Sequence, residues 1–282
     1  MNTCHRPAGP AGDRLLVDIS PESAGWGFSG LRVVRLAAGE RWQCDTGPDE
    51  LVVLPLSGSC TVTADDERAD LAGRPDVFAG PSDVAYVPRD TALTIASGPG
   101  GRFALASARA GRRLPFRHVP ATEIPVELRG AGAASRQVHN FATPGVLDAD
   151  RLIACEVLTP SGNWSSYPPH KHDQERPGES VLEEIYYFEV RDDGMAYQRV
   201  YGTPERPIEV LAEVRTGDVV LIPHGWHGPS MAVPGYDLYY LNVMAGPGDR
   251  AWLICDDPAH AWIRGTWADQ PVDPRLPMGG AS

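Results

Sequence analysis

The chain has 282 residues, of which 42% are hydrophobic, and it carries a formal net charge of −12 with a pI near 5.1. This length can bury one large core or two ordinary ones, and the acidic balance excludes a nucleic-acid or anionic-membrane surface, which needs clustered positive charge. Neither an apolar run of about 18 residues nor an apolar signal segment occurs, so we expect a cytoplasmic protein that binds a small molecule.

The first half contains short segments typical of strands. Residues 1–14 are rich in Pro and Gly and are expected to form a loose arm. Runs rich in Val, Leu, Ile and Ala follow, each bounded by turn residues, at 30–39, 49–65, 83–90, 91–97 and 101–110. No long window sustains a helical period, and the 30 glycines and 27 prolines favour an all-β sandwich or barrel.

A second series of strand-like segments follows a proline-containing stretch at 112–130. Its members lie at 135–141, 151–160, 168–172, 182–190, 195–202, 208–214, 217–226 and 236–246. We therefore expect two domains in tandem, one at 1–128 and one at 129–282.

The two series resemble each other in order, but they differ where a metal site would lie. Residues 50–54 correspond to 184–188, and 83–88 correspond to 218–223. The first series has Trp42, Gln43 and Cys44 at the place where the second has a histidine pair. The first domain is therefore predicted to be structural and free of metal.

His170 and His172 form that pair in the run Pro-Pro-His-Lys-His. Side chains alternate along a strand, so both imidazoles should lie on one face. Imidazole nitrogens with a carboxylate oxygen suit zinc, iron, manganese or nickel. Lys171, between them, is the single lysine beside 24 arginines, and strand parity directs it away from the metal face.

The segment at 182–190 offers two glutamates on opposite faces of one strand. The face that includes Glu184, Tyr186 and Phe188 is the more apolar. A carboxylate buried there needs a cation, because its desolvation must be compensated. Glu184 is thus the preferred metal ligand, and Glu183 is expected to face solvent.

A further histidine ligand is expected from Gly217–Gly228, in which a buried strand runs into a Pro-Gly turn. His224 and His227 lie three residues apart there, and reasoning from the residues leaves the choice between them open.

These segments resemble the 5-deoxy-glucuronate isomerase family of myo-inositol catabolism. The resemblance rests on the segments at 168–172, 183–188, 217–228, 234–247 and 256–263, and a more distant likeness is to the 5-keto-4-deoxyuronate ketol-isomerase. It implies a bicupin of two jelly-roll-like β-barrels, with one divalent metal ion (Zn, Mn or Fe) in the second. Carried over residue by residue, the implied ligands are His170, His172, Glu184 and His227.

The resemblance also implies an isomerase acting on a uronic acid, which converts 5-deoxy-D-glucuronate to 2-deoxy-5-keto-D-gluconate through an enediolate or a hydride shift. Candidate proton carriers are His224, Tyr186, Tyr240 and Glu183. Candidate partners for the substrate carboxylate are Arg136, Lys171 and Arg199, with arginine favoured for bidentate geometry. The alternatives are a cupin dioxygenase, an isomerase of a related keto-deoxyuronate and a non-catalytic sugar-acid binding protein.

Two further expectations concern the surroundings of the site. Eleven residues, 173–183, separate His172 from Glu184, more than is usual in cupins, and this charged loop is predicted to be a lid over the substrate. Exposed sheet edges and faces leave a homo-oligomer open.

Overall fold

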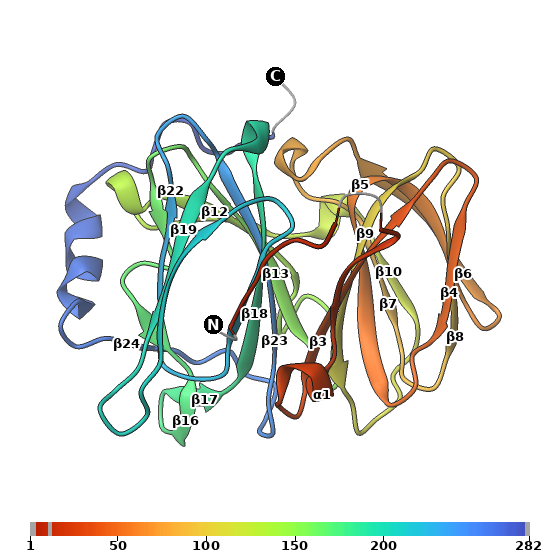
Figure 1. Cartoon of the computed structure of the whole chain (residues 1–282), viewed down its shortest axis with the longest axis horizontal. Coiled ribbons are helices and arrows are strands. Elements are labelled where there is room, and N and C mark those ends of the chain that lie inside the picture. The colour runs from red at the N-terminus through yellow and green to blue at the C-terminus, as the bar shows by residue number, and fades with distance from the viewer. Residues whose placement is uncertain (1–3, 11–12, 280–282) are drawn as a thin grey trace.

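The computed structural model describes residues 4–10 and 13–279, and most of its regular elements are β-strands, as predicted (Figure 1). The elements up to residue 123 are β1 (His5–Arg6), β2 (Leu15–Ile19), α1 (Pro21–Ala24), β3 (Ser29–Leu36), β4 (Arg41–Asp45), β5 (Asp49–Ala64), β6 (Glu67–Arg74), η1 (Val77–Ala79), β7 (Val84–Val87), β8 (Ala92–Ala96), β9 (Gly101–Arg109), β10 (Arg117–Val119) and η2 (Ala121–Glu123). Those that follow are β11 (Val126–Arg129), η3 (Gly132–Ala134), β12 (Arg136–Ala142), β13 (Ile153–Thr159), β14 (Trp164–Ser165), β15 (His170–Lys171), β16 (Asp173–Arg176), β17 (Glu179–Val181), β18 (Glu183–Val190), η4 (Arg191–Asp193), β19 (Ala196–Tyr201), β20 (Glu209–Val214), β21 (Val219–Ile222), β22 (Trp226–Ala232), β23 (Leu238–Ala245), β24 (Cys255–Asp256) and η5 (Ala261–Asp269).

The strands form three large sheets and one hairpin. A nine-stranded sheet takes the first half, in the order β10-β7-β5-β9-β3-β2 with β4, β6 and β8 attached. The second half holds a seven-stranded sheet, β1-β21-β18-β23-β13-β12-β11, and a six-stranded sheet, β20-β19-β22-β15-β24 with β14 on β22. The pair β16-β17 stands apart as a hairpin. Within the described residues, none of the helices has the length and apolar character that a membrane crossing requires.

The N-terminal arm is not loose where the structure describes it. His5 and Arg6 pair with Val220 and Val219, so β1 extends the seven-stranded sheet of the second half. Asp218 adds hydrogen bonds to the ring of His5 at 3.2 Å and to the backbone N–H of Ala8 at 2.8 Å. The expectation of a loose arm is therefore wrong for this part, and residues 1–3 and 11–12 lie outside the described chain.

Three apolar layers hold the molecule together. One fills the first half and a second fills the space between the seven- and six-stranded sheets. The third joins the two halves, because Ile185 and Tyr187 of β18 and Leu241 of β23 pack with Leu31 of β3 and Ala104 of β9. Figure 1 shows β18 and β23 at the centre, beside β3. These two strands are apolar on both faces because both faces are buried.

Charged groups at the junction of the halves are paired. The buried guanidinium of Arg74 contacts the carboxylate of Glu156, and Arg102 binds Glu189 at 2.7 and 2.9 Å. Pairing of this kind offsets the cost of desolvating each charge. The junction is therefore a packed interface with its polar groups satisfied.

Candidate metal centre and adjoining pocket

Three potential metal ligands lie together in the second half: His172 directly after β15, Glu184 on β18 and His227 on β22. His170 on β15 is the cross-strand partner of His227 on β22, and Glu184 lies on β18 in the facing sheet. The ligand atoms of His172, Glu184 and His227 all lie within 4.8 Å of one another, and all three residues are buried. Nε2 of His172 and Nε2 of His227 are each 3.1 Å from Oε2 of Glu184.

Backbone carbonyls orient the imidazole rings. Nδ1 of His172 lies 3.0 Å from the carbonyl oxygen of Leu182, and Nδ1 of His227 lies 3.2 Å from that of Gly225. A ring that donates from Nδ1 presents the lone pair of Nε2 on its other side. Nε2 of His227 is buried; its approach to Oε2 of Glu184 lacks the geometry of a hydrogen bond, and it bonds to no other described residue. Two lone pairs and a carboxylate directed at one point fit a cation.

The electrostatics act differently on Glu184, His170 and His172. Burial alone would raise the pKa of Glu184, but His227 and His172 beside it lower that pKa to about 2. Burial, together with His227, lowers the pKa of His170 well below its ordinary value. Burial would lower the pKa of His172, but the hydrogen bond and charge of Glu184 raise it. A metal needs an ionised carboxylate and neutral imidazoles, and the shifts favour these forms at Glu184 and His170.

His170 stands slightly apart from the other three. It is not in the group whose ligand atoms lie within 4.8 Å of one another, although its ring centroid is 4.5 Å from that of His227. Its Nδ1 lies 3.3 Å from the carbonyl oxygen of Pro168, which turns the rest of the ring toward the pocket that it lines.

The two adjacent glutamates point to opposite sides of β18, as their parity predicted. Glu184 faces the histidines, whereas the carboxylate of Glu183 accepts hydrogen bonds from the backbone N–H groups of Gly27, Phe28 and Ser29 at 2.7, 2.8 and 3.0 Å. The expectation that Glu183 faces solvent is wrong, because the first half packs against that side of the strand.

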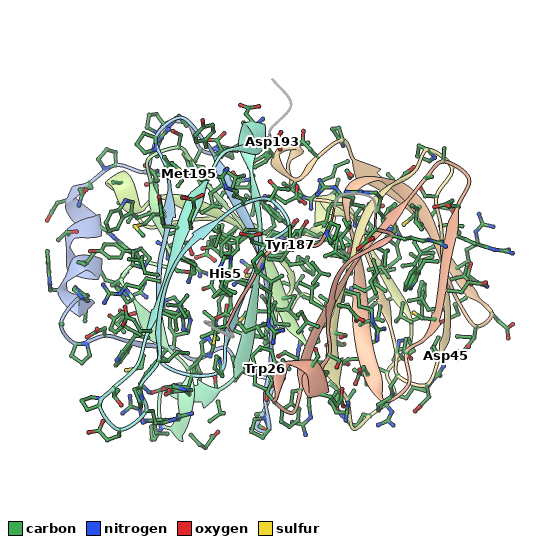
Figure 2. The ribbon with its side chains drawn as sticks, viewed as in Figure 1. His5, Trp26, Asp45, Tyr187, Asp193 and Met195 are labelled. Atoms are coloured by element: carbon green, nitrogen blue, oxygen red, sulfur yellow. The ribbon has the colours of Figure 1, made fainter. Side chains whose placement is uncertain are left out.

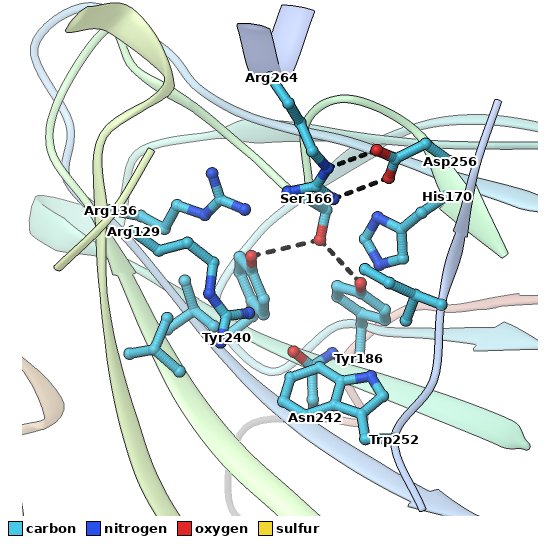
Figure 3. Close-up of a pocket in the computed structure, with 13 residues that line it drawn as sticks. Arg129, Arg136, Ser166, His170, Tyr186, Tyr240, Asn242, Trp252, Asp256 and Arg264 are labelled. Carbon is cyan, nitrogen blue, oxygen red and sulfur yellow. Dashed lines mark hydrogen bonds and ion pairs between the residues drawn. The ribbon is translucent and has the colours of Figure 1, made fainter. Parts of the chain in front are cut away.

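A cavity of about 320 Å³ opens beside the histidines (Figure 3). Its walls come from both sheets of the second half and from the segment after β23. They are formed by Arg129, Arg136, Val138, Val157, Ser166, His170, Tyr186, Tyr240, Asn242, Trp252, Ile254, Asp256 and Arg264.

A hydroxyl network crosses this pocket. Oγ of Ser166 lies 2.8 Å from the hydroxyl of Tyr186 and 3.3 Å from that of Tyr240, as the dashed lines in Figure 3 show. A Cβ at Gly228 would come within 1.8 Å of the carbonyl oxygen of Ser166, so the glycine after His227 permits the approach that places this serine. Burial raises the pKa of both tyrosines, which keeps their hydroxyls protonated.

Arg136 is the buried cation of the pocket that lacks a carboxylate partner. Its Nη1 donates to the carbonyl oxygens of Ala134 and Tyr167 at 3.1 and 3.4 Å, and no ion pair joins it to another described residue. Burial lowers its pKa to about 10. Arg129 and Arg264 also line the pocket, but they are paired with Glu127 and Asp256. Arg136 is therefore free to bind an anion.

Besides Glu183 and the group of His172, Glu184 and His227, three further predicted site residues lie outside this pocket wall. Nζ of Lys171 is bound to Asp173 at 2.5 Å and Glu179 at 2.6 Å. Arg199 is half-exposed and lies 3.9 Å from Glu209. His224 is half-buried. Burial lowers its pKa, and the positive charge of Arg206 lowers it further.

The loop expected to be a lid forms the β16-β17 hairpin. Lys171 anchors it through Asp173 and Glu179, and no residue of the hairpin is in the pocket wall. The segment after β23 contributes to that wall instead, through Trp252, Ile254, Asp256 and Arg264.

Sequence reasoning did not find several residues of the wall. Asn242 could have been found, because it is a polar residue inside the apolar run of β23, two positions from Tyr240. No local pattern indicates a direction for the others, which lie in loops or at strand ends (Arg129, Ser166, Trp252 and Asp256) or in the short helix η5 (Arg264).

The fold and the site together define a cupin-type protein, in which facing antiparallel sheets enclose a cluster of histidines and a glutamate. An oxalate decarboxylase of Bacillus subtilis superposes with a TM-score of 0.63 over 91% of this chain and 80% of its own; at 13% identity this supports the fold alone. The chain belongs to the KduI/IolB family, whose sequence profile matches residues 4–263.

Similar proteins carry one name. Proteins named 5-deoxy-glucuronate isomerase are 43% identical in Geobacillus thermodenitrificans (strain NG80-2), over 88% of this chain and 90% of the relative, and 38% identical in Bacillus subtilis (strain 168), over 89% and 93%. The crystal structure of an IolB-like protein from Salmonella typhimurium LT2 is 35% identical, with a TM-score of 0.87 over 92% of this chain and 98% of that one.

Proposed function

We propose that this chain is an aldose–ketose isomerase that converts 5-deoxy-D-glucuronate to 2-deoxy-5-keto-D-gluconate. The observation that carries this assignment is a buried His172–Glu184–His227 group beside a pocket whose buried Arg136 has no carboxylate partner. The relatives that are named 5-deoxy-glucuronate isomerase match nearly the whole chain.

One divalent ion, Zn, Mn or Fe, would be held by His170, His172, Glu184 and His227. When bound, the ion supplies a Lewis acid that stabilises negative charge on the substrate oxygens. The Nε2 atoms of His172 and His227, each 3.1 Å from the ionised carboxylate of Glu184, support this ligand set.

The pocket residues divide the remaining work. An aldose-to-ketose isomerisation moves one hydrogen from the hydroxyl-bearing carbon to the neighbouring aldehyde carbon, and one proton from the hydroxyl oxygen to the aldehyde oxygen. The hydroxyls of Tyr186, Ser166 and Tyr240 form a continuous chain that can exchange a proton with the substrate oxygens. Arg136 is positioned to bind the carboxylate at the other end of the substrate in bidentate fashion.

The other residues predicted for proton transfer or carboxylate binding do not take these roles. Glu183 uses both carboxylate oxygens for backbone N–H groups, and Lys171 is saturated by two carboxylates. His224 and Arg199 lie away from the pocket wall. We assign Tyr186 and Tyr240 the proton-carrying role and Arg136 the carboxylate.

We further propose that the catalytic unit is 129–282 and that 1–128 is structural. Each residue in the pocket wall comes from Arg129 onward. The first half contributes packing against β18 and the backbone N–H groups that hold Glu183.

The test is to incubate the metal-loaded protein with 5-deoxy-D-glucuronate and to follow the reaction by NMR in parallel with an oxygen electrode. The aldehyde and hydrate signals should disappear as ketose signals appear in equal amount, without oxygen uptake. Oxygen consumption would identify a dioxygenase instead, and binding of the acid without turnover would identify a binding protein.

A further inference from the structure

The seven-stranded sheet presents ordered rows of side chains to the pocket. Residues paired across antiparallel strands share a face of the sheet, and so do residues two apart on one strand. The first row, at the metal end, contains Glu184 and Met244, and the second contains Tyr186, Asn242 and Cys155. The third row contains Tyr240, Val157 and Val138, and the fourth contains Arg136 and Arg129. The order is a metal ligand, a polar row, an apolar row and a cationic row.

This order fixes the direction in which an acidic sugar lies in the pocket. Its carbonyl end belongs beside Glu184, and its carboxylate belongs on Arg136. The carbon next to the carboxylate then lies against the row just before the arginines. Val138 is two residues from Arg136 on β12, and Val157 is its cross-strand partner on β13.

That row offers almost nothing to a hydroxyl group. Val138 and Val157 are 1% and 5% exposed and both line the cavity. The other members are Phe188, which is apolar and pairs with Tyr240, and Tyr240 itself, whose hydroxyl already lies 3.3 Å from Oγ of Ser166. A hydroxyl pressed against two valines would lose its bonds to water and gain none in return.

The next row toward the metal is different. Asn242 is buried, and its Nδ2 has no hydrogen-bond partner among the residues that the structure describes. Nε1 of Trp252, in the segment over the pocket, is likewise without a partner. The free donors of Asn242 and Trp252 therefore lie where the hydroxylated middle of a sugar acid would be held. The row of Val138 and Val157 has no such donor.

We infer that Val138 and Val157 are specificity-determining residues that select a methylene next to the substrate carboxylate and reject a hydroxyl there. The inference rests on the proposed function, because 5-deoxy-D-glucuronate has a methylene at this position. D-glucuronate, which has a hydroxyl there, is the competitor that the two valines exclude.

The experiment compares kcat/KM for 5-deoxy-D-glucuronate and D-glucuronate in the metal-loaded wild type and in Val138→Thr and Val157→Thr. Threonine is close to valine in shape and has, in place of one methyl group, a hydroxyl that can pair with the substrate. The wild type should favour the deoxy acid by on the order of 10²-fold, and each threonine variant should narrow that preference about tenfold. D-glucuronate also closes a ring through its 5-hydroxyl, but this effect cancels in the comparison of variant with wild type.

Val243→Thr is the matched control. Val243 is buried on β23 but belongs to the core between the halves, on the opposite face from Asn242. It should lower stability as the other threonine variants do and leave the preference unchanged. Val157→Ala makes room for the hydroxyl and serves where a threonine variant does not fold.

The outcomes distinguish a failure of the proposed function from a failure of the role given to the two valines. A metal-loaded wild type that turns over neither acid overturns the proposed function and the role of the valines with it. Turnover of the deoxy acid with an unchanged preference in folded, metal-loaded Val138→Thr and Val157→Thr overturns the role of the valines alone. A narrowed preference in the Val243→Thr control has the same consequence.

Discussion

The hydroxyl of Tyr186 is the polar group of the pocket that connects the metal centre to the rest of the site. Its ring lies 6.2 Å from that of His227 and 5.0 Å from that of Tyr240, measured between centroids. Ser166 joins the two hydroxyls. A proton can therefore be exchanged along three hydroxyl groups that lie in or beside the pocket wall.

Tyr186→Phe should lower kcat by roughly 10²–10⁴-fold, the usual contribution of a positioned acid or base, while metal content stays at the wild-type level. Ser166→Ala should give a smaller loss, because it removes the bridge and leaves both phenols. The measurement is steady-state turnover together with elemental analysis of bound metal.

The neighbouring tyrosine supplies the control for that variant. Tyr187 faces the other side of β18, where its hydroxyl donates to Glu189 at 3.0 Å. Tyr187→Phe should reduce the free energy of unfolding by about 1 kcal/mol and leave kcat unchanged. Equal losses of kcat in the two variants would contradict the assignment of the proton path to Tyr186.

At the scale of elements, β15 and the β16-β17 hairpin form one unit. Lys171 is held by Asp173 and Glu179, and its ammonium lies 5.4 Å from the ring centroid of Trp226. A compact ammonium fits between two carboxylates where the wider guanidinium fork would need more room. The single lysine of the chain therefore anchors the hairpin beside the histidines.

Lys171→Met should lower the free energy of unfolding by about 3 kcal/mol, because it leaves buried carboxylate charge without a partner. Adding Glu179→Gln should restore part of that loss. Arg199→Met, which removes an exposed cation, should stay within about 0.5 kcal/mol of the wild type. Urea denaturation of the four proteins measures these differences, and a Lys171→Met protein as stable as the wild type would contradict the anchoring role.

Sequence patterns reached the strands and part of the site. Alternation along 182–190 separated Glu184 from Glu183, and the histidine spacing placed His170 and His172 near each other, because these are local properties of one strand. What Glu183 contacts depends on Gly27, more than 150 residues away, and no local pattern contains that information. The same holds for the hairpin, whose charge and proline content suggested a lid but whose position depends on partners fixed by the fold.

At the scale of the whole molecule, the two halves share one apolar layer and a set of buried ion pairs. Burial would raise the pKa of Glu156, but Arg74 from the first half, with His139 beside it, lowers that pKa to about 2. The hydroxyl of Tyr239 donates to the same carboxylate at 2.6 Å. The first half therefore stabilises the sheet that carries the site.

The depressed pKa of Glu156 predicts how stability depends on pH. Its folded-state value lies below the ordinary 4.5, so its contribution is present above pH 4.5 and is lost as pH falls toward 2. The amount is on the order of 3 kcal/mol. Glu156→Gln should be less stable than the wild type at pH 7, and the difference should shrink between pH 4.5 and pH 3 in urea denaturation. A difference that stays constant over this range would contradict the ion-pair account.

The central claim is that the buried histidine–glutamate cluster holds the metal ion on which isomerase turnover depends. The most direct measurement is metal content and turnover of 5-deoxy-D-glucuronate in the same preparation of His227→Ala, with His260→Ala as the control outside the pocket. We predict that metal and turnover are both lost in His227→Ala and both retained in His260→Ala. Full turnover by His227→Ala with metal still bound would contradict the claim.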